Sequence, residues 1–172
     1  MSELARTIAA EAHASQRDKL GRDYVDAHLR PIAEAAAVFG PEAEAAGWLH
    51  DVLEDTEISA ADLREHGIPE HVIDAIESVT KVPGQEYDEL IAHTCQHPLG
   101  RLVKLIDNAW NIACNPALAQ VKPDKAHDLM TRKYLPARER LLAASELDAD
   151  SPEALRVDEI LHSHLVRLHA GG

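Results

Sequence analysis

Apolar residues recur every three or four positions along most of this chain, and that spacing is typical of amphipathic α-helices. Leu4, Ile8 and Ala12 follow it near the N-terminus, and Leu155 begins a similar series near the C-terminus. No stretch alternates apolar and polar residues over the length of a strand. The pattern therefore predicts an all-α fold, a helical bundle of about eight or nine helices.

Glycine and proline residues divide this pattern into segments. The sequence that begins at Ser59 has the spacing of a capping box, and Pro31 and Pro136 mark points where a helix starts or kinks. Residues 1–172 are expected to form one domain. We expect helices over Leu4–Lys19, Tyr24–Val38, Pro41–Asp55, Ser59–Gly67, Pro69–Pro83, a short segment from Tyr87, Pro98–Asn115, Pro123–Glu146 and residues 151–169.

The composition is that of a globular helical protein with a strong negative charge. Of 172 residues, 45% are hydrophobic and 27% are charged, which excludes a disordered chain. Aromatic residues make up only 3%, which disfavours a β-sandwich or barrel. The net charge of −13 would repel backbone phosphates, so nucleic acid is not an expected partner. A small anionic substrate would need a metal ion or a local basic pocket.

The location expected from the sequence is the cytoplasm. The first six residues are polar and do not resemble a signal peptide. Cys95 and Cys114 cannot form a disulfide framework, and no apolar run approaches the roughly 20 residues that span a bilayer. The oligomeric state is left open.

His50 and Asp51 are adjacent in a predicted helix, and Glu54 and Asp55 follow them by four residues each. Residues four apart lie on one face of a helix. Such groups at the buried edge of a helix are costly unless something neutralises them, and a divalent cation would do so. Imidazole nitrogen with carboxylate oxygen suits Mn²⁺, Fe²⁺ or Zn²⁺, and Mg²⁺ is a further candidate. Because the chain has 11 histidines, a chance His-Asp pair is the competing interpretation.

Three further residues favour a metal site. His28 lies on the apolar side of the preceding predicted helix, where a lone histidine is more often structural. Asp107 follows an apolar run, and an ionised aspartate there needs a partner or a metal. Asn111 lies one turn after Asp107, although it would also suit a helix end. We therefore predict four metal ligands from three helices, with Glu54 and Asp55 just outside: His28, His50, Asp51 and Asp107.

This ligand set predicts hydrolysis of a phosphoester or pyrophosphate. The metal would bind the scissile phosphate and lower the pKa of a bound water molecule. Glu54 or Asp55 would orient that water or transfer its proton, a contribution of roughly 10²- to 10⁴-fold to the rate.

Several sequence blocks carry a family resemblance. Residues 46–56 (AGWLHDVLEDT), 79–81 (VTK) and 103–111 (VKLIDNAWN) are similar to the blocks ALLHDVVEDT, VTK and IKLADRLHN. Residues 13–28 are similar to the signature H-x-x-Q-x-R-K-x-G-x-P-Y-I-x-H-P. By these motifs the chain resembles the HD superfamily of metal-dependent phosphohydrolases, most closely the hydrolase domain of RelA/SpoT-type proteins and the small alarmone hydrolases. The resemblance covers about residues 9–144.

The resemblance implies removal of the 3′-pyrophosphate from guanosine tetra- and pentaphosphate, the alarmones of the stringent response, with Mn²⁺ as the cofactor. It implies that His28, His50, Asp51 and Asp107 hold the metal and that Glu54 and Asp55 are the catalytic acidic pair. The residues that it implies for nucleotide binding are Asn111, Arg17, Lys19 and Tyr24, with Lys81 from the VTK block.

The chain also departs from the family pattern. Asp18 stands where the family has a basic residue, one extra residue precedes His28, and Trp110 replaces a histidine. These departures keep two alternatives open. One is a nucleotidase or nucleoside-triphosphate hydrolase on the same site, and the other is a nucleotide-binding regulatory module without catalysis.

Other polar residues are expected to have ordinary roles. Lys104 and Lys133 are expected to be solvated, and Tyr134 is expected to pack in the core. The C-terminal His162, His164 and His169 are expected on the surface.

Overall fold

The chain is described by a computed structural model that covers residues 1–148 and 150–170. The helices are α1 (Ser2–Ala12), α2 (Arg30–Ala36), α3 (Pro41–Leu49), α4 (Val52–Asp55), α5 (Ala60–Glu65), α6 (Glu70–Val79), α7 (Tyr87–Thr94), α8 (Pro98–Val121), α9 (Pro123–Asp128), α10 (Leu135–Ser145) and α11 (Pro152–Ala170). A π-helical turn, Val25–Leu29, precedes α2 and a 3₁₀ turn, Ala37–Phe39, follows it, while a second π-helical turn, Leu129–Tyr134, joins α9 to α10.

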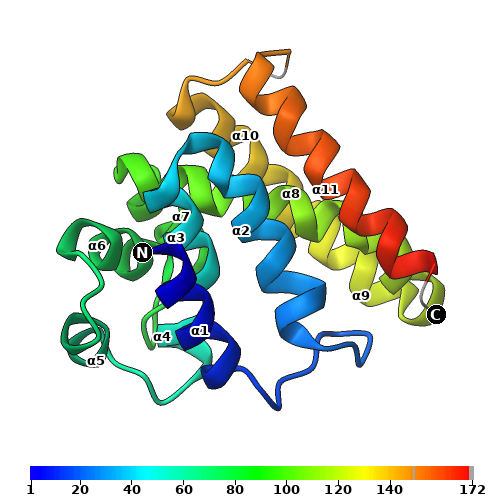
Figure 1. Cartoon of the computed structure of the whole chain (residues 1–172). Coiled ribbons are helices and arrows are strands. Elements are labelled where there is room, and N and C mark those ends of the chain that lie inside the picture. The colour runs from blue at the N-terminus through cyan, green and yellow to red at the C-terminus, as the bar shows by residue number, and fades with distance from the viewer. Residues whose placement is uncertain (149, 171–172) are drawn as a thin grey trace.

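The prediction of an all-α fold is confirmed. The structure is 77% helical, and α9 continues into α10 through the second π-helical turn (Figure 1). The only β-type pairing among them is an isolated bridge between Arg17 and Asp23. In the part of the chain that the structure covers, no helix is both long and apolar enough to cross a membrane.

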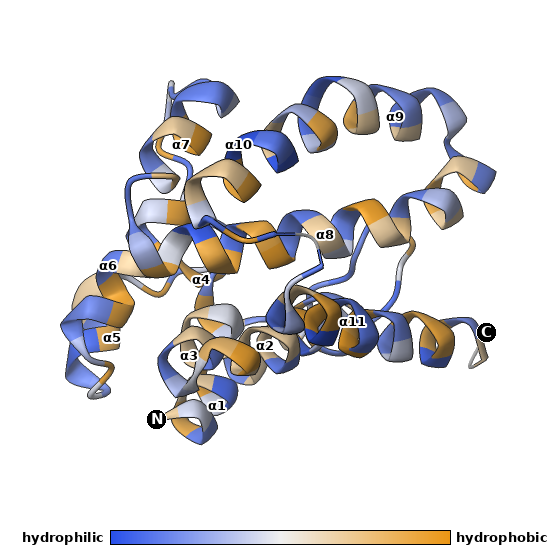
Figure 2. Cartoon of the chain, turned by 90° about the horizontal axis from the view of Figure 1, so that it is seen from above, coloured by the Kyte–Doolittle hydropathy of each residue, from blue (hydrophilic) through white to orange (hydrophobic). Residues whose placement is uncertain are grey.

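Helix α8 is the central element of the fold. It contacts α2, α3, α6, α7, α9, α10 and α11. Figure 2 shows α9 and α10 on one side of α8, and α2, α3 and α11 on the other. Residues carried by the middle of α8 therefore face two layers of the protein at once.

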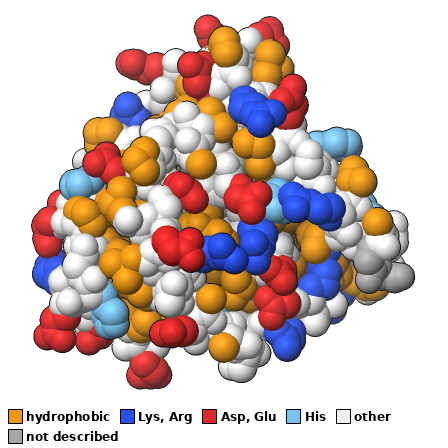
Figure 3. Space-filling model, in the orientation of Figure 1, with side chains coloured by type: hydrophobic (Ala, Val, Ile, Leu, Met, Phe, Trp, Pro, Cys, Tyr) orange, Lys and Arg blue, Asp and Glu red, His pale blue; other side chains and the backbone are white. Residues whose placement is uncertain are grey.

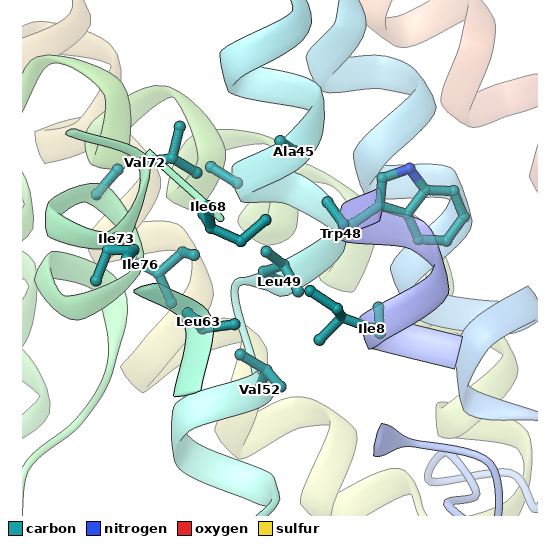
Figure 4. Packing of buried hydrophobic residues seen from close by; sticks show 14 of the residues in the cluster. Ile8, Ala45, Trp48, Leu49, Val52, Leu63, Ile68, Val72, Ile73 and Ile76 are labelled. Carbon is teal, nitrogen blue, oxygen red and sulfur yellow. The ribbon is translucent and has the colours of Figure 1, made fainter. Parts of the chain in front are cut away.

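The largest hydrophobic cluster lies among α1, α3, α5 and α6 (Figure 4). Trp48 and Leu49 from α3 pack with Ile8 from α1, and Ile73 and Ile76 from α6 complete it. These side chains are almost completely buried, and full burial of each stabilises the fold by about 1.5–3 kcal/mol. This packing fixes the end of α3, immediately before His50.

Helices α2 and α3 approach each other closely, and this brings the segments that carry His28 and His50 together. A Cβ atom on Gly47 of α3 would lie 2.9 Å from the backbone of Ala33 in α2, so only glycine allows this spacing. The π-helical turn with His28 leads directly into α2, and His50 follows α3. The contact therefore sets the distance between the segments that carry the two histidines.

Some predicted helix boundaries are wrong. The first helix ends at Ala12 rather than Lys19, because the Asp18 carboxylate accepts hydrogen bonds from the backbone of Leu20 and Arg22 and so stabilises a loop. Helix α8 was predicted to end at Asn115, but it continues through Pro116 to Val121. Its packing against α9, where the Asn115 amide donates to Ala126 O at 3.2 Å, outweighs the proline penalty.

The C-terminal helix contradicts one further expectation. His164 is buried rather than on the surface, and its Nε2 lies 2.8 Å from a Glu34 carboxylate oxygen in α2. Its ring also meets Trp110 of α8 edge-on.

On the face shown in Figure 3, acidic and basic side chains lie next to each other, so the net charge of −13 does not appear there as one acidic patch.

Candidate functional site

The chain breaks its helix at His50 and Asp51, where a continuous helix was predicted. Helix α3 ends at Leu49 and α4 begins at Val52. In an unbroken helix the Asp51 amide would donate to Gly47 O, but that oxygen lies 2.8 Å from His50 Nδ1. The imidazole thus competes for the carbonyl, and the break lets both side chains point into the same region.

His28 lies in the π-helical turn Val25–Leu29 rather than in a regular helix. Such turns insert an extra residue and are frequent at functional sites. Its Nε2 lies 3.2 Å from Asp51 Oδ2 and 3.5 Å from Asp107 Oδ1. The turn therefore directs the imidazole toward both aspartates.

Asp107 is buried in the middle of α8, and its two oxygens face different groups. Oδ2 lies 3.0 Å from Lys104 Nζ. Oδ1 accepts a hydrogen bond of 2.5 Å from the Asn111 amide, which also donates to the Asp107 backbone carbonyl. These contacts leave Oδ1 turned toward His28.

The four predicted metal ligands converge in one place. His28, His50 and Asp107 each offer a ligand atom, and these three atoms all lie within 4.8 Å of one another. Asp51 is not part of that set of three, but its Oδ2 lies 3.0 Å from His50 Nε2 and 3.2 Å from His28 Nε2. We refer to these four residues as the His–Asp cluster.

The protonation of His50 shows why a cation fits the cluster. Its Nδ1 faces a carbonyl, which can only accept, so Nδ1 carries a proton. In the neutral ring Nε2 is then a lone pair, and it points at the Asp51 carboxylate, another lone-pair donor. Within the described residues this buried nitrogen has no hydrogen-bond partner. A metal ion between the two would satisfy both groups.

The electrostatics of the cluster favour positive charge beside its carboxylates. Burial works against a charge on His50, but Asp51 and Asp107 together raise its pKa to about 9. Burial likewise disfavours a charged Asp51, yet the neighbouring histidines hold its pKa well below the usual range. A buried group of two carboxylates and two imidazoles with this need for positive charge is suited to a divalent ion.

Tyr24 supports the cluster from the side. Its hydroxyl donates a 2.6 Å hydrogen bond to Asp51 Oδ2, and its ring stacks on His28 with centroids 4.8 Å apart. Burial and the Asp51 charge raise the pKa of Tyr24, so it remains a donor. Tyr24 was predicted to contact the nucleotide, but in the structure its hydroxyl is hydrogen-bonded to the predicted metal ligand Asp51.

Glu54 and Asp55 lie at the rim of the cluster and are exposed. Glu54 accepts a 3.0 Å hydrogen bond from the backbone N–H of Lys81. Asp55 Oδ2 accepts a 2.7 Å hydrogen bond from the Gln16 amide, and Gln16 Oε1 lies 2.5 Å from His13 Nδ1. Each acidic side chain is thus held by one neighbour and has a remaining carboxylate oxygen.

A pocket of about 290 Å³ lies beside the cluster. Several of the residues predicted to bind nucleotide line it, together with His28 and Asp55: Arg17, Lys19, Tyr24 and Asn111. Lys81 is not among the lining residues, and its side chain is exposed. The structure therefore brings four of the five predicted nucleotide contacts to one pocket.

Asp18 also lines this pocket, but its carboxylate is already used. It forms an ion pair with Arg22 at 2.7 Å and accepts hydrogen bonds from two backbone amides of its own loop. Arg17 is paired in the same way with Asp23 at 2.8 Å. The negative charge that departs from the family pattern is therefore neutralised locally.

Sequence reasoning missed two groups at the site. Lys104, expected to be solvated, is largely buried against Asp107, and the three-residue spacing of the pair in a helix was a usable signal. Tyr134, expected to pack only, lines the pocket, and its hydroxyl accepts from Lys19 Nζ at 3.0 Å. That contact joins residues 115 positions apart, so no local pattern reveals it.

The comparisons with known proteins agree with the motifs. No family model matches the chain. Over 147 residues, 80% of this chain, it is 30% identical to a guanosine-3′,5′-bis(diphosphate) 3′-pyrophosphohydrolase of Aquifex aeolicus. It is 31% identical over 87% of its length to a probable enzyme of the same name from Synechocystis, and 27% identical over 81% to a GTP pyrophosphokinase of Streptomyces coelicolor. The chain spans only about a fifth of these relatives, 21%, 19% and 18% of their lengths.

A solved structure shares the fold over nearly the whole chain. It is a metazoan ortholog of SpoT, described as hydrolysing ppGpp, with a TM-score of 0.69, 21% identity and coverage of 94% of each chain. The resemblance to the hydrolase domain of RelA/SpoT-type proteins is therefore confirmed, and with it the HD-type helical fold.

Proposed function

We propose that this chain is a metal-dependent phosphohydrolase that removes the 3′-pyrophosphate from guanosine 3′,5′-bis(diphosphate) and related nucleotides. The observation that carries the proposal is the His–Asp cluster, which lies beside a pocket of about 290 Å³ and has two acidic side chains at its rim. The named activity of the Aquifex and Synechocystis relatives supports the choice of substrate.

The proposed cofactor is Mn²⁺, held by His28, His50, Asp51 and Asp107. The orphaned His50 Nε2 and the mixed nitrogen and oxygen donors support this choice. When bound, such an ion supplies positive charge to the phosphate and makes a water molecule more acidic. The chain's own part is to hold the ligands in place, through Lys104 on Asp107, Tyr24 on Asp51 and the Gly47 carbonyl on His50.

The acidic pair would handle the protons of the reaction. Hydrolysis adds a water oxygen to phosphorus and breaks the bond to the 3′ oxygen, which leaves as the ribose hydroxyl of GDP, with pyrophosphate as the second product. A carboxylate would take a proton from water, and a proton would pass to the departing 3′ oxygen; Glu54 and Asp55 are the exposed acids at the rim that could do so. Their fixed neighbours, Lys81 N–H and the Gln16 amide, orient one oxygen and leave the other available.

The nucleoside part of the substrate would lie in the pocket, near Asn111, Lys19 and Tyr134. Asp18 does not oppose this placement, because Arg22 neutralises its charge. A free nucleotide, and not a nucleic acid, is the proposed ligand, since the charge of −13 repels a phosphate polymer. A cytoplasmic location is part of the same proposal.

The test is turnover of guanosine 3′,5′-bis(diphosphate) by the purified protein with Mn²⁺, with GDP and pyrophosphate as the measured products. Chelator-treated protein is the control. We expect equimolar release of both products that stops on chelation. If metal-loaded protein releases neither product, the alarmone substrate is excluded, and a panel of other nucleotides then distinguishes a nucleotidase from a binding module.

A further inference from the structure

The carbonyl oxygen of Ala27 belongs to the peptide group that leads into His28, a member of the His–Asp cluster. Ala27 is buried in the π-helical turn Val25–Leu29, so solvent is a poor partner for this oxygen. In a regular helix the amide of residue 31 would donate to it. Residue 31 is a proline, which has no N–H and whose ring crowds the carbonyl four residues earlier. The sequence therefore takes from Ala27 O its regular helical donor.

Trp110 of α8 supplies a donor to this oxygen. Its indole Nε1 donates to Ala27 O at 2.9 Å, across 83 positions of the chain. Both residues are at least 98% buried, so each polar group depends on the other instead of on water. The hydrogen bond ties the turn that carries His28 to the helix that carries Asp107, three residues before Trp110.

The indole ring is held in place from its other side. His164 of α11 meets the ring edge-on, with centroids 6.4 Å apart and planes at 83°. His164 is in turn fixed by Glu34 of α2, at 2.8 Å. Trp110 also packs in one buried cluster with Val157 of α11. Because packing fixes the ring, the indole N–H is a donor with a fixed direction.

The π-helical turn solves a problem of register at His28. This chain has one residue more before His28 than the family signature, and its proline follows His28 by three positions instead of directly. One extra residue in a regular helix would rotate the next side chains by about 100° around the axis. The turn absorbs the extra residue, so His28 still faces Asp51 and Asp107. The bond from Trp110 stabilises the turn at the carbonyl that the proline leaves open.

We propose that Trp110 is a positioning residue, which holds the metal ligand His28 through the Ala27 carbonyl. The inference rests on the proposed function, since it concerns how one proposed Mn²⁺ ligand is held against the others. The indole N–H fixes the plane of the peptide group before His28, and that plane sets the direction in which the imidazole leaves the backbone. Groups that orient metal ligands in this way change metal affinity by roughly 10- to 100-fold.

The test separates the N–H of the indole from its bulk. A histidine at this position keeps an N–H where the indole nitrogen stands, because both side chains attach a five-membered ring through the same atom. Phenylalanine fills more of the space but has no N–H. We expect Trp110→Phe to bind Mn²⁺ at least about tenfold more weakly than wild type, and Trp110→His to stay close to wild type. Packing alone predicts the opposite order.

Val157→Ala is the matched control, because Val157 packs in the same cluster as Trp110 and its side chain has no polar atom. Calorimetry measures the Mn²⁺ affinity of each variant, and thermal unfolding measures its stability. We expect Val157→Ala to unfold at a lower temperature with unchanged Mn²⁺ affinity. The proposal is wrong if Trp110→Phe binds Mn²⁺ like wild type, if Trp110→His binds it no more tightly than Trp110→Phe, or if Val157→Ala loses as much affinity.

A second measurement needs neither turnover nor a stable Phe variant. The chain has two tryptophans, so its ¹H–¹⁵N spectrum contains two indole signals, and the spectrum of Trp110→His assigns them. If the indole bond favours metal binding, metal binding must favour the bond by the same factor. Zn²⁺, which is diamagnetic, should therefore slow hydrogen exchange of the Trp110 indole about tenfold or more in wild type.

The outcomes distinguish this inference from the proposed function. Equal exchange rates with and without bound Zn²⁺ would overturn the inference alone. A wild type that binds metal but hydrolyses no guanosine 3′,5′-bis(diphosphate) would overturn the proposed function, and the two measurements above would still decide the role of Trp110. A wild type that binds neither Mn²⁺ nor Zn²⁺ would overturn both.

Discussion

The His–Asp cluster and the loop after α1 both hold opposite charges, but they hold them in different ways. In the cluster, His28 meets Asp51 and Asp107 across 23 and 79 positions of the chain. In the loop, Arg17 meets Asp23 and Asp18 meets Arg22, within six residues. The loop therefore stabilises its own conformation, whereas the cluster exists only when α2, α3 and α8 have packed.

This difference teaches where a substitution has consequences. The cluster is buried, so removal of one charge leaves its partners desolvated and unpaired, which costs about 3–5 kcal/mol in such sites. The loop is partly exposed, and an ion pair there contributes about 0–1 kcal/mol. Gln16 is the link between the two, because it lies in the loop and holds Asp55 at the rim of the cluster.

The largest effect is expected from Asp51→Ala. It removes a carboxylate that faces both histidines, so Mn²⁺ binding and turnover should be lost together. Calorimetry with Mn²⁺ and the product assay measure the two. Asp26→Ala is the matched control, since Asp26 pairs only with Arg30 on the surface and should change neither. An active Asp51→Ala enzyme would remove Asp51 from the ligand set.

Glu54→Gln distinguishes the role of the rim in catalysis from the role of the cluster in metal binding. The amide can still accept from the Lys81 N–H, so the loop should keep its place, but it cannot take a proton. We expect unchanged Mn²⁺ affinity and a kcat lower by roughly 10²- to 10⁴-fold. Turnover at the wild-type rate would show that Glu54 only anchors residue 81.

Gln16→Met should have a smaller effect that acts through Asp55. The substitution keeps the length of the side chain but removes its hydrogen bonds to His13 and Asp55. A fall in kcat of about tenfold is expected, the value of one hydrogen bond to a charged group. The double variant with Asp55→Asn is the decisive measurement. If Gln16 acts through Asp55, the second substitution should abolish the effect of the first, whereas independent effects would multiply.

The smallest effect is expected from Asp18→Asn. Because Arg22 already neutralises this carboxylate, KM for guanosine 3′,5′-bis(diphosphate) should change by no more than about threefold. Thermal unfolding checks that the loop is intact. A much lower KM in the variant would mean that Asp18 repels the substrate after all.

Much of the fold was predictable because its signals are local. The capping box at Ser59 and Asp62 is present, and the all-α class follows from the spacing of apolar residues. The helix break at His50 was not predictable, because it depends on an imidazole that competes for a backbone carbonyl. The burial of His164 was missed for a similar reason, since its partner Glu34 is 130 residues away.

The sequence by itself determined the helical class, the capping and turn residues, and which acidic and histidine side chains occur in motifs. These follow from interactions between neighbours along the chain. The tertiary structure alone decided that His28, His50 and Asp107 meet, that Lys104 is buried against Asp107, and that Lys133 lies over Tyr87. Those placements depend on how the helices pack around α8, and packing is a property of the whole chain.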